Sequence, residues 1–291
     1  PATYASVSLA HAFQKPLYIL PQSIGPLRRQ WERRMLAKGY GRARRIYLRD
    51  SISLRLAGEL GLPMENVSYA PDPAFDLAPA NPMEATNLLQ TWGADMTKPK
   101  LGVTVIAPMG RSFVTAEVKN YYAVLEQTLT RFLQCYTAQV VLFNQVSGPT
   151  ANENDGEAAA ALCSRLKAQG LEAVHINQVV RPAQLKASYG LMQAFLASRL
   201  HSGVFALGMN VPTVFIGYLS KTRGMLQALE LENNVIDLKD LKEQDLWEKL
   251  SYTWEHATQE RSVLEVKMPA IKAASHAPAQ AIREDFMRYH G

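Results

Sequence analysis

The sequence predicts an α/β fold with two Rossmann-like domains, each built on a parallel sheet. Strand-like runs alternate with helix-like runs from end to end, which is typical of parallel sheets covered by helices. A proline-containing stretch of weak periodicity, residues 76–100, separates two such series. The 291 residues are 47% hydrophobic, which is enough apolar material for two cores.

The first series contains three short strands and two helices. The strands are expected at 17–20, 45–48 and 67–69, and the helices at 27–39 and 51–60. Ser51 is the expected N-cap of the second helix, with Asp50 as the other candidate, and Gly61 is its expected terminator. We assign residues 1–96 to the N-terminal domain.

The second series is longer and alternates more regularly. Its strands are expected at 101–106, 139–143, 171–176, 194–196, 212–216 and 234–236. Its helices are expected at 116–136, 182–191, 221–231, 244–256 and 261–288. A further helix is expected after the polar loop 144–155 and ends at residue 167. We assign residues 97–260 to the C-terminal domain and 261–291 to a closing helix.

Composition and cysteine usage exclude several classes of protein. No apolar run reaches the ~20 residues that span a bilayer. Cys135 and Cys163 stand alone without a CxxC pair, which argues against disulfide and zinc sites and favours a reducing cytoplasm. Neither GxGxxG nor GxxxxGK[ST] occurs, so no nucleotide fingerprint is present.

The formal net charge of +5 is concentrated near the N-terminus. The cations of this basic stretch are Arg28, Arg29, Arg33, Arg34, Lys38, Arg42, Arg44, Arg45 and Arg49. Trp31 and Met35 lie among them and indicate an amphipathic helix with an exposed basic face. Such a face fits an anionic membrane surface or polymer, or it is a solvated helix face. No nucleic-acid motif accompanies it, so we expect no nucleic-acid partner.

The segment 197–208 is the most informative part of the chain. It follows the buried strand 194–196 and opens a helix of small and apolar residues, so Arg199 and His201 fall on a strand-to-helix turn. In open α/β sheets, ligands bind at such turns. Arg offers a planar fork for phosphate or carboxylate, and His offers a proton near neutral pH. The turn therefore predicts an anion-handling acid/base site, with a capped helix and a packed His as the alternative.

Further polar residues follow other predicted strands. Residues 22–26 follow the first strand, and their small and polar side chains allow the backbone to approach a ligand. Arg49 ends the second strand and either enters the site or forms a surface ion pair. Asp72 follows the third strand and is a turn residue or a catalyst. Lys221 follows the strand after the turn at Arg199. It either supplies a second cation for a phosphate group or is a solvated surface residue.

Together these pieces resemble the polysaccharide pyruvyl transferase family. The matching motifs are PQSIGP at 21–26, RDS at 49–51, PDPAF at 71–75, SRLH at 198–201 and PTVFIGYLSK at 212–221. The acidic loop 148–155 is also similar, and the resemblance covers residues 17–241. It implies a GT-B-like fold, with the acceptor side on residues 1–96 and the donor side on 97–260. It also implies transfer of pyruvate from phosphoenolpyruvate to two hydroxyls of a sugar, which forms a ketal and releases phosphate.

The resemblance also implies roles for individual residues. His201 would be the catalytic acid/base, and no cofactor or metal would be required, since phosphoenolpyruvate is the donor substrate. Substrate binding would fall to Arg49, Arg199, Leu200, Lys221, Gln22, Ser23 and Gly25. The acceptor would be a sugar or lipid-linked oligosaccharide of an exopolysaccharide or cell-surface glycan. The enzyme would work in the cytoplasm, with peripheral contact at the inner membrane face.

One departure from the family leaves alternatives open. Family members begin with a strand and a Gly/Asn/Asp-rich segment ahead of the PQSIGP motif, so we expect the front of the N-terminal domain to be missing here. One alternative is a nucleotide-sugar-dependent GT-B glycosyltransferase, for which Glu230 and Glu232 are the acidic residues to consider at the donor ribose. A second alternative is a non-catalytic glycan- or membrane-associated domain.

Overall fold

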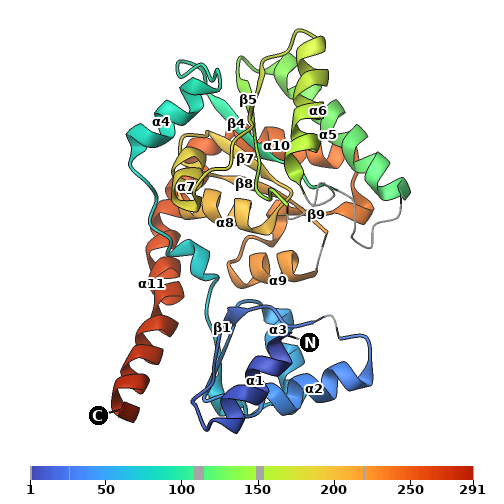
Figure 1. Cartoon of the computed structure of the whole chain (residues 1–291). Coiled ribbons are helices and arrows are strands. Elements are labelled where there is room, and N and C mark those ends of the chain that lie inside the picture. Colours follow the sequence, from blue (N-terminus) through green and yellow to red (C-terminus); the bar gives the residue numbers. More distant parts are fainter. Residues whose placement is uncertain (1, 26, 108–114, 149–153, 219, 291) are drawn as a thin grey trace. The chain divides into compact units, whose positions relative to one another are not determined.

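The computed structural model describes the chain except for residues 1, 26, 108–114, 149–153, 219 and 291 (Figure 1). Its contacts divide the chain into two compact units. The first unit comprises Pro1–Asp76, Ser220–Glu232 and Pro269–Gly291, and the second comprises Leu77–Leu219 and Asn233–Met268.

The first unit is built on a parallel sheet of three described strands in the order β1-β2-β3. These are β1 (Tyr18–Gln22), β2 (Arg45–Leu48) and β3 (Val67–Tyr69). The register between β1 and β2 shifts between Ile19 and Gln22. Pro21 lies within this interval. Because proline has no N–H to donate to a neighbouring strand, it occurs at edge strands and at irregular positions such as this one.

Four helices accompany this sheet among the described residues. They are α1 (Ala2–Ala12), α2 (Gln30–Tyr40), α3 (Ser51–Glu59) and α9 (Ser220–Ala228). The N-cap of α3 is Asp50, whose carboxylate accepts from the Ser53 amide at 2.7 Å, so the expected cap at Ser51 is wrong by one residue. Gly224 of α9 lies so close to α3 that an added Cβ would be 3.2 Å from Ile52.

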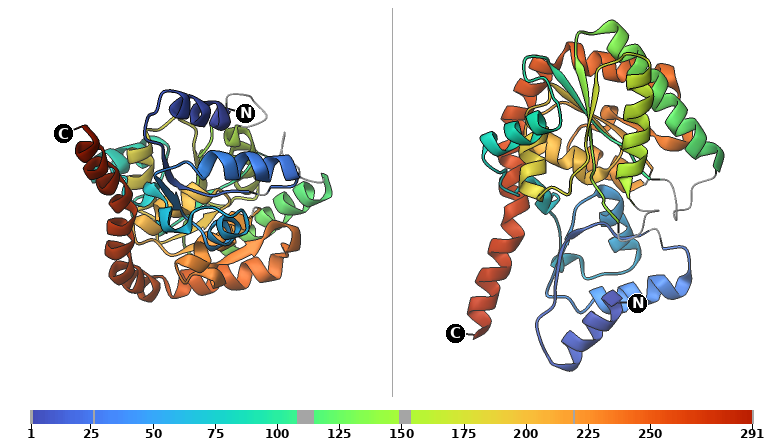
Figure 2. Two further views of the ribbon diagram at one scale, coloured as in Figure 1. Left: turned by 90° about the horizontal axis from the view of Figure 1, so that it is seen from below. Right: turned by 45° about the horizontal axis from the view of Figure 1, so that its top comes forward.

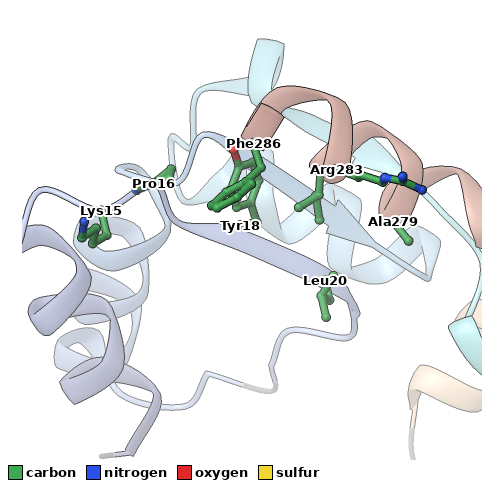
Figure 3. Close-up of a pocket in the computed structure, with 8 residues that line it drawn as sticks. Lys15, Pro16, Tyr18, Leu20, Ala279, Arg283 and Phe286 are labelled. Carbon is green, nitrogen blue, oxygen red and sulfur yellow. The ribbon is translucent and has the colours of Figure 1, made fainter. Parts of the chain in front are cut away.

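The end of the long helix α11 (Ala257–His290) also belongs to the first unit. Ala279, Ile282, Arg283 and Phe286 recur at helical spacing and form one face of this helix. Together with residues at the start of the chain and on β1, they line a groove of about 810 Å³ (Figure 3). Tyr18 also donates a hydrogen bond of 2.6 Å to Asp285. The lining of this groove is mainly apolar.

The second unit contains a sheet of six described strands, all parallel. They are β4 (Lys100–Thr104), β5 (Gln139–Phe143), β6 (Ala173–Ile176), β7 (Ala194–Ala197), β8 (Thr213–Gly217) and β9 (Val235–Asp237). Their order, β6-β5-β4-β7-β8-β9, is the doubly wound order 3-2-1-4-5-6. The four central strands are buried at every residue, as expected with helices on both faces.

Helices cover both faces of this sheet (Figure 2). One face packs against α5 (Thr115–Cys135), α6 (Asp155–Ala168) and α10 (Glu243–Glu255), which share one apolar core with the strands. The other face carries α7 (Pro182–Tyr189) and α8 (Leu200–Gly208). Tyr189 of α7 packs on Phe143 and Phe195 of the sheet at ring distances of 4.8 and 4.4 Å. The two parallel sheets confirm the predicted α/β fold class.

Helix α4 (Pro82–Thr91) packs against α7 of the second unit. The Ala80 amide donates to the Ala183 carbonyl at 2.9 Å, and Arg181 pairs with Glu84 at 2.7 Å. Residues 77–96, which the sequence analysis assigned to the N-terminal domain, therefore belong to the second compact unit.

Candidate functional site

The predicted turn at Arg199 lies at the topological switch point of the second sheet. β4 and β7 are neighbours, and β5 and β8 lie on their outer sides. At such a point the loops that leave the carboxyl ends of the two strands run in opposite directions, and a crevice for ligands opens between them. β7 ends at Ala197 and α8 begins at Leu200, so Ser198 and Arg199 form the connection.

Close packing and hydrogen bonds fix the start of α8 beside the end of β4. A Cβ on Gly203 would lie 2.0 Å from the Phe215 ring, so only glycine allows this approach of α8 to β8. Ser202 donates to the Arg199 carbonyl at 2.6 Å, and its hydroxyl lies 2.7 Å from that of Thr104. The Ser198 amide also donates to the Thr104 hydroxyl at 3.3 Å.

Arg199 is buried, with 6% of its surface exposed. Its Nε donates to Asp155 Oδ2 at 2.9 Å, and its Nη2 donates to Asp155 Oδ1. Asp155 itself is fully buried. Part of the fork that the sequence analysis assigned to a donor anion is therefore used inside the protein. Asp155 lies at the end of the acidic loop 148–155 that resembles the family, but its pairing with Arg199 was not predicted.

Two tyrosines behind the turn were also missed. Tyr121 donates to the Ser198 hydroxyl at 2.8 Å and accepts from the Ile106 amide at 3.2 Å. Tyr122 donates to the Ile106 carbonyl at 2.8 Å. Burial raises the pKa of Tyr121 well above its usual value and raises the pKa of Tyr122 to about 12. Both phenols are therefore neutral hydrogen-bond donors at physiological pH.

Leu200 and His201 occupy the first turn of α8. Leu200 is half-buried, whereas His201 is exposed. The first amides of a helix have no intrahelical acceptor, and together with the helix dipole they favour an anion. This end of the sheet thus combines an anion-favouring helix terminus with an accessible imidazole.

In the first unit, the structure brings Gln22, Ser23 and Arg49 together. Arg49 Nε donates to the Ser23 hydroxyl at 3.1 Å, and the Arg49 amide donates to the Gln22 carbonyl at 3.2 Å. The guanidinium also pairs with Asp72, and the two side chains are only 12% and 3% exposed. The ion pair that was the alternative for Arg49 therefore exists, but it is mostly buried.

The remaining predicted residues of the first unit shape the loop and helix beside this pair. Gln22 donates to the Tyr40 hydroxyl at 2.9 Å. Gly25 has a φ of +86°, a left-handed conformation that side chains rarely adopt. Asp72 accepts from the Ala74 amide at 2.9 Å and so also has the expected turn role.

Lys221 lies in the first turn of α9, a helix of the first unit, and is half-buried. Arg199, Leu200 and His201 belong to the second unit. Pro26, Leu219 and residues 149–153, which also carry the resemblance, lie outside the described residues. Among the residues that the structure describes, no cluster of His, Cys, Asp and Glu could hold a metal ion. No described helix has both the length and the apolar composition that a membrane span needs.

Comparisons with known proteins agree with these observations. A family model described as polysaccharide pyruvyl transferase matches residues 2–220. The amylovoran biosynthesis protein AmsJ of Erwinia amylovora is 20% identical over 242 residues, which cover 82% of this chain and 58% of AmsJ. The chain thus spans less than two thirds of that relative.

The fold is similar to those of solved proteins that bind nucleotides. The crystal structure of Anabaena Alr3699/HepE in complex with UDP and glucose superposes with a TM-score of 0.62 at 14% identity, over 98% of this chain and 75% of that one. UDP-GlcNAc 2-epimerase from Neisseria meningitidis bound to UDP-GlcNAc superposes with a TM-score of 0.63 at 12% identity, over 97% and 73%. At these identities the likeness supports the GT-B-like fold.

Proposed function

Because the chain belongs to the polysaccharide pyruvyl transferase family, we propose that it transfers pyruvate from phosphoenolpyruvate to two hydroxyls of a sugar. The products are a cyclic pyruvate ketal and phosphate. Family membership and the similarity to AmsJ support a transferase role in polysaccharide biosynthesis. The phosphoenolpyruvate donor and the ketal-forming step go further and are the specific content of the proposal.

The exposed imidazole of His201 in the first turn of α8, at the switch point, carries this proposal. Phosphoenolpyruvate has a phosphate and a carboxylate, and the amides at the start of α8 suit either anion. Arg199 adds positive charge beside them. Asp155 contacts Nε and Nη2, and Tyr218 also forms a hydrogen bond with this guanidinium, so we assign Arg199 a supporting positive charge beside the donor.

The reaction needs a balanced movement of two protons. A proton is delivered to the methylene carbon, which becomes a methyl group and leaves the adjacent carbon electrophilic. One sugar hydroxyl adds to that carbon, the C–O bond to phosphate breaks, and the second hydroxyl closes the ring. One of the two hydroxyl protons balances the new methyl group, and the other leaves with phosphate. We assign one or both transfers to His201, a role typically worth ~10²–10⁴ in rate.

The predicted residues of the first unit have supporting roles in this proposal. Arg49 and Lys221 are proposed as substrate-binding cations of the first unit, because each lies next to a predicted strand end. Gln22 and Ser23 hold Arg49 through the hydrogen bonds described above, and Gly25 lies in the loop that follows β1. We propose all three as substrate-binding residues, and Leu200 as a donor contact beside His201. No cofactor or metal enters the proposed reaction.

A titration separates this proposal from the glycosyltransferase alternative, because Alr3699/HepE was crystallised with UDP and glucose. Phosphoenolpyruvate, inorganic phosphate and UDP-glucose are titrated in parallel by calorimetry. We expect phosphoenolpyruvate to bind more tightly than phosphate, and UDP-glucose not to compete with it. Binding of UDP-glucose alone would support a nucleotide-sugar enzyme, with Glu230 and Glu232 as residues to test. Binding of none of the three would support a non-catalytic domain.

We also propose that the acceptor is a lipid-linked oligosaccharide at the cytoplasmic membrane face, and that the basic stretch contacts anionic lipid there. Arg28, Arg29, Arg34 and Lys38 are exposed along α2 and its N-terminus, and Trp31 among them is 53% exposed. Arg33 and Arg44 have acidic partners in Glu59 and Asp285, at 3.4 and 2.7 Å. Exposed tryptophan among basic residues is typical of interfacial helices.

A further inference from the structure

We propose that Asp155 is a positioning residue that fixes the shape of the switch-point site and acts on it through Arg199. Its effect on the donor rests on the proposed function, whereas its effect on the surrounding loops does not. Asp155 lies at the first position of α6, behind the N-cap Asn154, and its carboxylate is completely buried. A helix N-terminus favours a negative charge at this position.

The carboxylate of Asp155 connects three loops. It accepts from the Ala107 amide at 2.8 Å, in the loop after β4, and from the Val146 amide at 3.2 Å, in the loop after β5. It also accepts from Nε and Nη2 of Arg199, in the turn after β7. β5, β4 and β7 are consecutive strands in the sheet. One side chain therefore ties together the carboxyl ends of three adjacent strands.

Only an ionised carboxylate fits these four donors. Asn has the same shape, but its amide nitrogen would face the two N–H groups from which one carboxylate oxygen now accepts. It would also leave the buried guanidinium of Arg199 without a counter-charge, which is strongly unfavourable. A change of one atom at residue 155 should therefore loosen all three loops.

Arg199 transmits this constraint to the reactive turn. Its backbone carbonyl accepts from the Ser202 hydroxyl at 2.6 Å and from the Gly203 amide at 3.3 Å, as the N-cap residue of α8. The contact of Asp155 with the Arg199 side chain therefore fixes where α8 begins. It also fixes the orientation of Leu200 and His201 in the first turn of α8. Asp155 would orient His201 without being a catalytic residue.

The test compares Asp155→Asn with Glu126→Gln, a matched control in the same unit. Glu126 pairs with Arg165 at 2.5 Å on the outer helices, where both side chains are partly exposed. Amide hydrogen exchange at Ala107 and Val146 and the NMR signal of the His201 ring are recorded for each variant. We expect roughly tenfold faster exchange at both amides in Asp155→Asn. We also expect a displaced His201 signal there, and neither change in Glu126→Gln.

Phosphoenolpyruvate affinity is the second readout, and we expect Asp155→Asn to lower it roughly 10–100-fold, the range for the loss of one hydrogen bond to a charged group. A folded Asp155→Asn with wild-type exchange, His201 signal and affinity would overturn the inference. If the wild type binds no phosphoenolpyruvate, the proposed function fails, while exchange and the His201 signal still decide the role of Asp155.

A double variant covers the case in which Asp155→Asn does not fold. Asp155→Asn with Arg199→Gln removes both charges and so leaves no unpaired guanidinium. A positioning role predicts that this folded protein still shows fast exchange at Ala107 and Val146. Recovery of wild-type exchange would mean that Asp155 only balances charge, and would overturn the inference.

Discussion

Arg199 and Asp155 form a bidentate ion pair that joins the turn after β7 to the start of α6, with Nε and Oδ2 2.9 Å apart. Both side chains are buried. A guanidinium makes this contact with two parallel N–H donors, which an ammonium cannot reproduce. The candidate site therefore depends on a specific fork as well as on a positive charge.

The first prediction is that Arg199→Lys destabilises the protein and weakens phosphoenolpyruvate binding. The loss of one charge-assisted hydrogen bond in a buried pair should lower the free energy of unfolding by about 1.5–3 kcal/mol. Urea denaturation gives this value, and calorimetry gives the affinity. Arg165→Lys is the control, because the Arg165–Glu126 pair is partly exposed and such pairs contribute about 0–1 kcal/mol. Equal losses in the two variants would contradict the prediction.

The second prediction is that His201→Ala abolishes transfer and leaves the fold intact. The side chain is exposed in the first turn of α8, so its removal should change the free energy of unfolding by less than about 0.5 kcal/mol. Turnover should fall by ~10²–10⁴ if the imidazole transfers a proton. Release of phosphate from phosphoenolpyruvate, together with a thermal melt, measures both effects. Normal turnover would exclude the acid/base role, and loss of folding would identify a structural histidine.

Local patterns in the sequence predicted the elements of this fold better than their arrangement. The strand expected at 45–48 is β2, and that at 139–143 is β5, because apolar runs bounded by turns are local signals. The strand order of the second unit, by contrast, follows from packing between distant segments. Residues 77–96 show the same limit: their composition predicted a boundary, but only the contact of α4 with α7 shows which unit they join.

The same distinction holds for the site. The order of strand, Arg199, His201 and helix is local, and the structure has the predicted turn. Asp155 lies 44 residues before Arg199 and reaches it only because β5 and β7 lie on either side of β4. Tyr121 was predicted to lie on a helix, but helical periodicity does not distinguish an apolar contact from a hydrogen bond to Ser198.

The third prediction concerns the close packing beneath the turn. Gly203→Ala would place a methyl group 2.0 Å from the Phe215 ring, so α8 would have to move away from β8. We expect a loss of about 1–3 kcal/mol in the free energy of unfolding, as for other overpacked cores. Phosphoenolpyruvate affinity should fall as well, because the same helix carries Leu200 and His201.

Gly58→Ala is the matched control for Gly203→Ala. Gly58 also lies in a helix, α3, but an added Cβ would contact nothing within 4 Å. Alanine there should raise the free energy of unfolding by up to about 1 kcal/mol, since glycine is the poorer helix former. Similar stability changes in both variants would contradict the close packing of α8 on Phe215.

The last prediction is salt-sensitive binding of the protein to anionic vesicles through α2. Each basic residue near an anionic surface contributes ~1 kcal/mol, and the attraction decays over a Debye length of ~8 Å at physiological salt. Phosphatidylserine-containing vesicles should therefore co-sediment the protein at low salt and release it at high salt. Vesicles of phosphatidylcholine alone should not bind it. Arg34→Glu, on the exposed side of α2, should weaken the binding at least about fivefold.

Lys239→Glu separates a local contact from the effect of net charge. It changes the charge by the same amount as Arg34→Glu, but Lys239 is an exposed residue of the second unit. If α2 is the contact, Lys239→Glu should bind vesicles like the wild type, and the Trp31 fluorescence, isolated by comparison with Trp31→Phe, should shift to the blue only with anionic lipid. If Arg34→Glu and Lys239→Glu weaken vesicle binding equally, the binding would depend on net charge and not on a contact through α2. Equal binding to both kinds of vesicle would leave the basic stretch as a solvated helix face.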